Sequence, residues 1–392
     1  MGERRCQVGI VGSGPAGLLL GHLLHQAGIH AVLIERQTRA HVEDRIRAGV
    51  LERTTTDLLD RLDIAARKDA EGLPHNGFAL ADGERIIRID IARLTGHHVT
   101  VYGQTEVTRD LIDAADARGL EIVWQARDVV PTDIESDRPS IRWTDDTGAH
   151  RLECDFVVGC DGFHGPSRHA IPEALRTGYE AAYPFGWLGI LADVPPCDHE
   201  LIYANHDRGF ALASMRSATR SRYYIQVALD EKIEDWPDER LWDELAIRLG
   251  PDAGSRIVRG PSIEKSIAPL RSFVSEPMRH GRLFLAGDSA HIVPPTGAKG
   301  LNLAASDVSY LSDALIVFYK TGQSTGIEGY SDLALARVWK SERFSWYLTK
   351  LMHRFPGDGA FERKMQRAEL DYVAQSEAMQ TAIAENYVGL PL

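Results

Sequence analysis

The stretch CQVGIVGSGPAGLLLGHLLHQAGIHAVLIER, residues 6–36, decides the fold. An apolar run before Gly12 is typical of a buried strand, and the leucine-rich stretch after Gly17 is typical of a buried helix that ends near Gly28. A second apolar run, ending at Glu35, indicates another buried strand. The order strand, helix, strand predicts a βαβ unit and therefore an α/β fold with a parallel sheet.

The glycine turn inside this unit has the spacing of a dinucleotide-binding loop. Gly12, Gly14 and Gly17 form G-x-G-x-x-G between the strand and the helix. Glycines permit the tight turn and let the backbone approach a pyrophosphate, which the helix N-terminus stabilises. Glu35 ends the second strand 18 residues after Gly17, where a carboxylate can bind a ribose hydroxyl. The motif alone also occurs for packing, but strand, helix and acid together favour a dinucleotide.

The composition excludes several classes of partner. Of 392 residues, 44% are apolar and 26% charged, which is ordinary for a globular protein. The net charge of −12 argues against nucleic acid or an anionic membrane as a partner. No apolar run approaches 18 residues, so no transmembrane helix is expected. The cysteines show no metal-like spacing, so we expect no metal and a reduced, cytoplasmic protein; they are Cys6, Cys154, Cys160 and Cys197.

The sequence pattern divides the chain into three parts. Residues 1–180 carry the βαβ unit and further strand-like runs, with a short excursion near 75–97. Residues 181–268 alternate like strands and predict a β-rich substrate-binding domain. Residues 269–392 return to the first domain and become mostly helical from about 302. We therefore predict a Rossmann-like domain in discontinuous segments, an inserted β-rich domain and a helical C-terminal region.

Two further strands end in glycine and aspartate. Asp161 follows the run DFVVGC, and Asp288 follows LFLAG. An aspartate at the end of such a strand can reach a ribityl hydroxyl of a flavin. Either one alone more often makes a turn with its own backbone.

The stretch GFALASMRSATRSRYYIQVAL, residues 209–229, predicts a hairpin with its turn at 217–219. Ser214 and Arg216 point to one face of its first strand, and Arg222 and Tyr224 to one face of its second. If both faces coincide, a hydroxyl, a guanidinium and a phenol converge on one patch. Such a patch favours an anion, because a guanidinium pairs with a carboxylate in bidentate fashion.

Together these motifs resemble the flavoprotein aromatic hydroxylases, the class A flavin monooxygenases. Longer stretches resemble the members that hydroxylate 4-hydroxybenzoate, from about residue 7 to 391; among them are HELIYANH, RSATRSRYY, PPTGAKGLNLAASDVS and IAENYVGLP. The resemblance implies an FAD-binding fold, FAD as cofactor, NADPH (or NADH) as transient cosubstrate, O2, and a homodimer. It further implies conversion of 4-hydroxybenzoate to 3,4-dihydroxybenzoate, in which the substrate phenolate attacks a flavin hydroperoxide.

The resemblance also implies roles for individual residues. Ser214, Arg216 and Tyr224, the carboxylate trio, would hold the substrate carboxylate with Met215 beside them. By parity along the strand, the Met215 side chain is expected on the face opposite Ser214. Tyr203 would bind the substrate phenol, Tyr387 and His75 would carry its proton to solvent, and the Pro295 carbonyl would lie near the reacting ring edge.

Cofactor contacts are implied at positions spread along the chain: Gly12, Ser13, Gly14, Ala16, Gly17, Glu35, Arg45, Arg47, Val50, Gln104, Asp161, Arg222, Asp288, Leu301 and Asn302. Arg222 is expected to face the flavin rather than the carboxylate. Nicotinamide contacts are implied at Arg36, His41, Arg45, His164, Arg168 and Arg271. His41 stands where the NADPH-specific member has tyrosine, so the choice between NADPH and NADH stays open.

Two alternatives remain. A related hydroxylase of another phenol, such as 3-hydroxybenzoate or salicylate, would keep the FAD motifs but alter the carboxylate trio and the two tyrosines. A non-catalytic dinucleotide-fold binding protein would retain the glycine loop and lose Asp161, Asp288 and the relay. Asp288, Ser289 and His291 suggest a hydrolase triad, but no nucleophile elbow accompanies them, so we interpret them as accidental.

Overall fold

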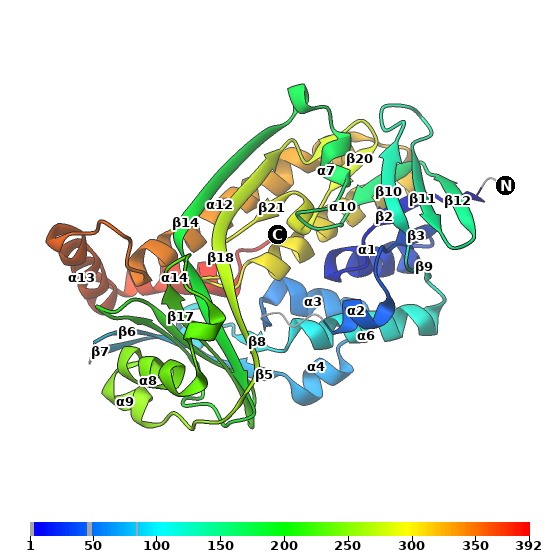
Figure 1. Ribbon diagram of the computed structural model, residues 1–392. Coiled ribbons are helices and arrows are strands. Elements are labelled where there is room, and N and C mark those ends of the chain that lie inside the picture. The colour runs from blue at the N-terminus through cyan, green and yellow to red at the C-terminus, as the bar shows by residue number, and fades with distance from the viewer. Residues whose placement is uncertain (1–3, 45–48, 84) are drawn as a thin grey trace.

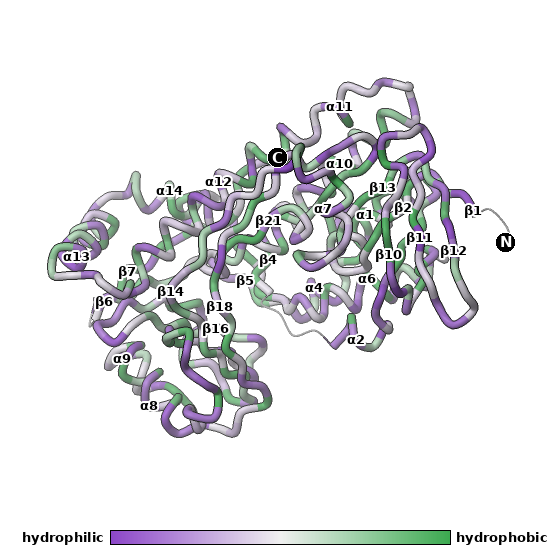
Figure 2. Tube along the Cα trace, turned by 45° about the horizontal axis from the view of Figure 1, so that its top comes forward, coloured by the Kyte–Doolittle hydropathy of each residue, from purple (hydrophilic) through white to green (hydrophobic). Residues whose placement is uncertain are grey.

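A computed structural model of the protein shows two large β-sheets (Figure 1). Two long strands of the second sheet run beside the segments that connect it to the first. The structure describes residues 4–44, 49–83 and 85–392. Helices cover both sheets, and the strands β2 and β13 run as hydrophobic segments through the interior (Figure 2).

The first large sheet contains the predicted βαβ unit and has the strand order β19-β20-β13-β2-β3-β9. Its strands are β2 (Val8–Val11), β3 (Ala31–Ile34), β9 (Glu121–Val123), β13 (Phe156–Gly159), β19 (Arg279–His280) and β20 (Leu283–Leu285). All neighbours run parallel except β19 and β20. The sheet joins segments far apart in sequence, so the prediction of an α/β domain built from discontinuous segments is confirmed.

Helix α1 (Pro15–Gln26) connects β2 to β3 and packs with α6 (Gln104–Arg118) and α10 (Gly300–Thr321) in the same core. By length and composition alone α10 could cross a membrane, with a mean hydropathy of 1.2 over an 18-residue window. This differs from the expectation that no such segment exists. Most of that window is buried inside the protein, as is typical of a core helix.

The second large sheet has eight strands in the order β21-β18-β14-β17-β16-β15-β6-β7. They are β6 (Phe78–Asp82), β7 (Arg85–Ile89), β14 (Thr177–Ala192), β15 (Leu201–Asn205), β16 (Ala211–Ser217), β17 (Arg220–Val227), β18 (Ser262–Glu276) and β21 (His291–Ile292). One face packs against α8 (Asp238–Arg248) and α9 (Gly250–Ser255). The other packs against α12 (Tyr330–Met352), α13 (Ala360–Gln375) and α14 (Glu377–Val388).

Strands β14 and β18 run side by side over 16 and 15 residues (Figure 1). Thr177 pairs with Glu276 at one end, and Ala192 pairs with Ser262 at the other. The predicted domain boundaries at 180/181 and 268/269 both fall inside these strands.

Two smaller sheets and several short helices complete the fold. One small sheet comprises β1 (Arg4–Arg5), β10 (Arg127–Thr132), β11 (Ser140–Asp145) and β12 (Gly148–Glu153), and the other β4 (Val50–Leu51), β5 (Leu73–His75) and β8 (Val99–Val101). The short helices are α2 (Arg39–Glu43), α3 (Arg53–Arg61), α4 (Ala66–Glu71), α5 (Ile91–Thr95), α7 (Ser167–Ala170) and α11 (Thr325–Glu328). Single 3-10 turns span Glu173–Leu175, Ile233–Asp235 and Gly287–Ser289.

Candidate active site

The three motif glycines have three different physical reasons to be glycine. Gly12 has φ +101°, and a Cβ there would lie 2.4 Å from the Cys160 carbonyl oxygen. A Cβ at Gly17 would lie 2.0 Å from the Gly12 oxygen, so α1 packs directly on the turn. A Cβ at Gly14 would meet nothing within 4 Å, and Gly14 therefore faces open space beside the N-terminus of α1. This is the arrangement a pyrophosphate requires.

Glu35 is fixed beside this loop. Its Oε2 accepts hydrogen bonds from the Ser13 N–H (2.8 Å) and the Ser13 hydroxyl (3.1 Å), and its Oε1 accepts one from the Gln37 N–H (2.9 Å). These hydrogen bonds connect the glycine loop to the end of β3. Ala16, at the start of α1, is buried.

The two strand-end aspartates differ in their surroundings. Asp161 Oδ2 accepts a hydrogen bond from the Ser167 N–H at 2.8 Å, while its buried Oδ1 has no partner among the described residues. Asp288 is exposed. It follows Gly287, where an added Cβ would lie 3.1 Å from the Ala304 Cβ. An open glycine loop, an unpaired buried oxygen and an exposed carboxylate fit FAD.

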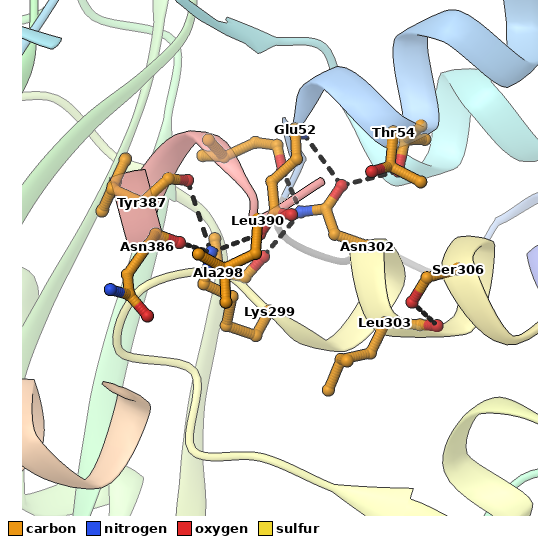
Figure 3. Close-up of polar contacts among 12 residues, drawn as sticks. Glu52, Thr54, Ala298, Lys299, Asn302, Leu303, Ser306, Asn386, Tyr387 and Leu390 are labelled. Carbon is orange, nitrogen blue, oxygen red and sulfur yellow. Dashed lines mark hydrogen bonds and ion pairs between the residues drawn. The ribbon is translucent and has the colours of Figure 1, made fainter. Parts of the chain in front are cut away.

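The start of α10 is held by Asn302, whose amide is fully bonded (Figure 3). Its Oδ1 accepts from the Glu52 N–H (2.9 Å) and the Thr55 hydroxyl (2.7 Å), and its Nδ2 donates to the carbonyls of Val50 (2.9 Å) and Ala298 (2.8 Å). The Asn302 side chain therefore has no free group for a cofactor, and the predicted contact with FAD would have to come from its backbone. Leu301 packs against the hydrophobic core around the first large sheet, and Gln104 begins α6. Arg45 and Arg47 lie outside the described residues.

The predicted hairpin is formed by β16 and β17, with a shorter turn at 218–219 because Ser217 belongs to β16. Ser214 pairs with Arg222, and the Ser214 hydroxyl donates to the Arg222 carbonyl at 2.9 Å. Because a hydroxyl has one proton, Ser214 must turn to donate to a carboxylate. Arg216 is half-buried, and burial lowers its pKa. Tyr224 stands opposite Leu212 on the next strand, and its side chain interacts electrostatically with Arg216.

Met215 lies on a different side from the one that parity predicts. It is buried in the same hydrophobic cluster as Tyr203, Leu212 and Tyr224. Its backbone stays in register with Ser221, and the strand register shifts only beyond it, between Met215 and Ser217.

Tyr203 and Tyr387, the tyrosine pair, are fully buried, and their hydroxyl oxygens are 3.0 Å apart. Phe78 stacks on the Tyr387 ring with centroids 4.1 Å apart. Burial raises the pKa of Tyr203 to about 12 and raises the pKa of Tyr387 well above its ordinary value. Both are therefore neutral phenols near pH 7, each able to accept one proton while passing on its own.

His75 and Pro295 are less directly connected to the tyrosine pair. His75 is buried at the end of β5, neither ring nitrogen has a partner among the described residues, and burial lowers its pKa. A proton transfer between Tyr387 and His75 thus needs a bridging water. Pro295 is exposed, and its carbonyl accepts from the Ala298 N–H at 3.0 Å.

Known proteins were compared with the chain as a whole. Residues 5–345 match the family model described as FAD binding domain. The chain is 53% identical over 392 residues to p-hydroxybenzoate hydroxylase of Acinetobacter baylyi (strain ATCC 33305 / BD413 / ADP1), covering 100% of this chain and 97% of that one. The chain belongs to the p-hydroxybenzoate hydroxylase family of FAD-dependent monooxygenases. The predictions of this family, of FAD and of monooxygenase chemistry are therefore confirmed.

More distant members of the wider group share the fold. Para-nitrophenol 4-monooxygenase of Pseudomonas sp. (strain WBC-3) is 26% identical over 338 residues, which span 81% of this chain and 79% of that one. The crystal structure of p-nitrophenol 4-monooxygenase from Pseudomonas putida DLL-E4 superimposes with a TM-score of 0.83 at 20% identity, over 99% of this chain and 100% of that chain.

The residues predicted to bind the nicotinamide coenzyme of this monooxygenase fall into two groups. Arg36 and His41 are exposed, one after β3 and the other in α2. His164, Arg168 and Arg271 instead surround Phe163, with the His164 ring and both guanidiniums 4.7–5.0 Å from its centroid. The coenzyme roles of both groups stay predictions.

Arg168, one of the predicted coenzyme contacts, is held by the protein itself. It is buried, and it donates to the carbonyls of Ser289 (3.0 Å) and Phe163 (2.8 Å). The supposed triad is also separated, because the Ser289 hydroxyl donates to the Gly159 carbonyl and His291 pairs with Asp307 at 2.6 Å.

Sequence reasoning missed a buried ion pair beside the backbone of Tyr387. Lys299 pairs with Glu52 and donates to the Asn386 carbonyl, and its Nζ lies 3.4 Å from the Tyr387 carbonyl (Figure 3). Arg337 lies 3.9 Å from the same Glu52. A lysine between glycines in GAKG gives no sign of burial, because the partners are 87 and 247 residues away.

Proposed function

We propose that this enzyme hydroxylates 4-hydroxybenzoate on the ring carbon next to its hydroxyl, giving 3,4-dihydroxybenzoate. One O2 and one NADPH (or NADH) with a proton are consumed, and water and the oxidised coenzyme are released. The observation that supports this substrate is a row of side chains on one sheet face. Tyr203, Leu212 and Tyr224 stand opposite one another on β15, β16 and β17, and Arg216 lies close enough to Tyr224 for the two side chains to interact electrostatically. One face thus offers a partner for a carboxylate and a partner for a phenol.

The carboxylate end is the simpler half of the mechanism. The guanidinium of Arg216 would pair with the substrate carboxylate, and the Tyr224 hydroxyl would donate to a remaining lone pair. Ser214 would add a third hydrogen bond after leaving the Arg222 carbonyl. These contacts fix the ring position along the sheet.

The phenol end prepares the ring for attack. When bound, FAD supplies the electrons and the activated oxygen. Tyr203 Oη would accept the substrate proton as its own proton passes to Tyr387 over 3.0 Å. The resulting phenolate is a better nucleophile than the phenol, and the dry surroundings of the pair keep that proton from being exchanged at random. His75 would release the proton to solvent through water.

The direct test is NADPH and NADH oxidation at 340 nm by the FAD-loaded protein, with and without 4-hydroxybenzoate, and chromatography of the product. Oxidation stimulated by 4-hydroxybenzoate and matched by 3,4-dihydroxybenzoate supports the proposal, and the two coenzymes are ranked in the same assay. Oxidation that yields only hydrogen peroxide would contradict the assigned substrate. Salicylate and 3-hydroxybenzoate serve as the competing substrates.

We further propose a cytoplasmic homodimer that acts without nucleic acid or membrane. The four cysteines are all free and buried, which favours a reducing compartment. Large side chains on α12 and α13 are exposed, including Trp346 (50%), Phe361 (70%) and Tyr372 (58%), which favours a covered surface in solution. Light scattering of the eluted protein would give twice the 43.4 kDa chain mass for a dimer and the chain mass itself for a monomer.

A further inference from the structure

Two guanidiniums and one carboxylate lie close together on the substrate face. Arg222 on β17 and Glu264 on β18 both stand opposite Leu191 of β14, one on each side of it. Their side chains meet across β14 in an ion pair between a buried Arg222 and a half-buried Glu264, with Arg222 Nη1 bonded to Glu264 Oε2. Glu264 Oε1 also accepts from the Ser266 hydroxyl at 2.8 Å.

A glycine of β14, Gly189, lies two residues before Leu191 and leaves room beside this pair. A Cβ at Gly189 would lie 3.0 Å from Arg222 Nη2 and 2.7 Å from Tyr224 Cε1. The Arg222 guanidinium therefore occupies space that a side chain would fill, 5.0 Å from the Tyr224 ring centroid. Burial alone would raise the pKa of Glu264, but the bonds from Arg222 and Ser266 lower it, so the carboxylate is ionised.

Arg216 has no such counter-ion. Within the described part of the chain it forms no ion pair, and its Nη1 donates to the carbonyl of its neighbour Met215 at 3.2 Å. The charged side chains that act on its pKa are Arg222 and Glu264. Because Glu264 pairs with Arg222, their charges cancel. The three side chains together carry one net positive charge, which is the charge of Arg216.

We propose that Glu264 is a specificity-determining residue, which limits the pocket to aromatic substrates with one carboxylate by neutralising Arg222. The inference rests on the proposed function, in which Arg216 binds the substrate carboxylate. An aromatic dicarboxylate would bring a second negative charge that finds no free cation and is repelled by Glu264. An unpaired charge in a buried site opposes binding strongly, which is how proteins reject near-relatives of a ligand.

The test compares 4-hydroxybenzoate with 4-hydroxyphthalate, which has one more carboxylate beside the first. Equilibrium binding to the FAD-loaded enzyme is followed by quenching of protein fluorescence, since Trp187 lies 5.1 Å from the Tyr224 ring. Glu264→Gln keeps an acceptor for Ser266 and removes the charge. We expect the ratio of the Kd for 4-hydroxyphthalate to the Kd for 4-hydroxybenzoate to fall by about tenfold or more.

The matched control is Asp193→Asn, which removes an exposed carboxylate paired with Arg220 (2.6 Å) at the tip of the same hairpin. It should leave the ratio of the two Kd values unchanged. A second comparison does not rely on the Glu264→Gln variant alone. R222Q leaves Glu264 unpaired and should weaken binding of both ligands, whereas R222Q/E264Q restores one net positive charge and should recover the wild-type ratio.

The failures are distinguishable. If the wild-type enzyme does not bind 4-hydroxybenzoate, the proposed function is wrong. If it binds 4-hydroxybenzoate and the ratio is the same in Glu264→Gln as in Asp193→Asn, the inference about Glu264 is wrong and the proposed function stands. If R222Q/E264Q binds both ligands no better than R222Q, the role of charge is likewise refuted.

Discussion

Tyr387→Phe tests the proton relay at its most completely described contact. The phenylalanine ring keeps the stacking on Phe78 at 4.1 Å and leaves no cavity, so the change removes one hydroxyl. Tyr203 then keeps a buried hydroxyl without the partner it had at 3.0 Å, which costs about 1–3 kcal/mol of the free energy of unfolding. Loss of a positioned proton acceptor should lower the hydroxylation rate by about 10²–10⁴-fold. Binding of 4-hydroxybenzoate at Arg216 should change little.

Rapid-mixing kinetics with product quantification measures the rate, and titration of bound 4-hydroxybenzoate by its phenolate absorbance against pH measures the proton transfer itself. The matched control is Tyr223→Phe, which removes an equally buried hydroxyl that accepts from the Cys197 N–H at 3.2 Å on the other face of the sheet. A rate for Tyr387→Phe within a few-fold of that for Tyr223→Phe, with unchanged ionisation of the bound substrate, would refute the relay.

Three more predictions follow from single side chains. Gly189→Ala would place a Cβ 2.7 Å from Tyr224 and should weaken 4-hydroxybenzoate binding about tenfold, measured by fluorescence titration, with about 1–3 kcal/mol lost in stability. Asn302→Ala leaves two donors and two carbonyls without their partner, so chemical denaturation should show about 3 kcal/mol or more of lost stability, together with weaker FAD retention. Burial lowers the pKa of His353 to about 3, so the unfolded chain binds a proton below about pH 6.5 that the native one refuses. His353 should therefore contribute a loss of about 1.4 kcal/mol of stability for each pH unit between about 6 and 3, and His353→Gln should reduce the slope by that amount in urea titrations across this range.

The sequence predicted those parts of the site that depend on residues close together in the chain. The roles of Gly12, Gly14 and Gly17 follow from backbone conformation and helix packing, which the motif and its flanking strand and helix already determine. The alternation that joins Ser214 to Tyr224 follows from strand periodicity, and the register between β16 and β17 brings them to one face.

What could not be predicted depends on neighbours that only the assembled sheet creates. Glu264 meets Arg222 from 42 residues away because β17 and β18 lie on either side of β14, where Gly189 leaves space for the Arg222 guanidinium. Strand alternation could not show that the Met215 side chain joins the hydrophobic cluster of Tyr203 and Tyr224. A count of charges could not show that Arg168 is buried against two carbonyls.

The long strands β14 and β18 limit how new members of this family can be made by recombination. β14 begins, and the antiparallel β18 ends, beside the nucleotide-binding part, so a crossover at 180/181 or 268/269 would join halves of one hydrogen-bonded ladder from two parents. Chimeras that exchange the substrate region should keep their cooperative unfolding when the junctions lie before Thr177 and after Glu276. Natural diversification of the substrate pocket is expected to proceed by point substitution along these strands rather than by exchange of a whole module.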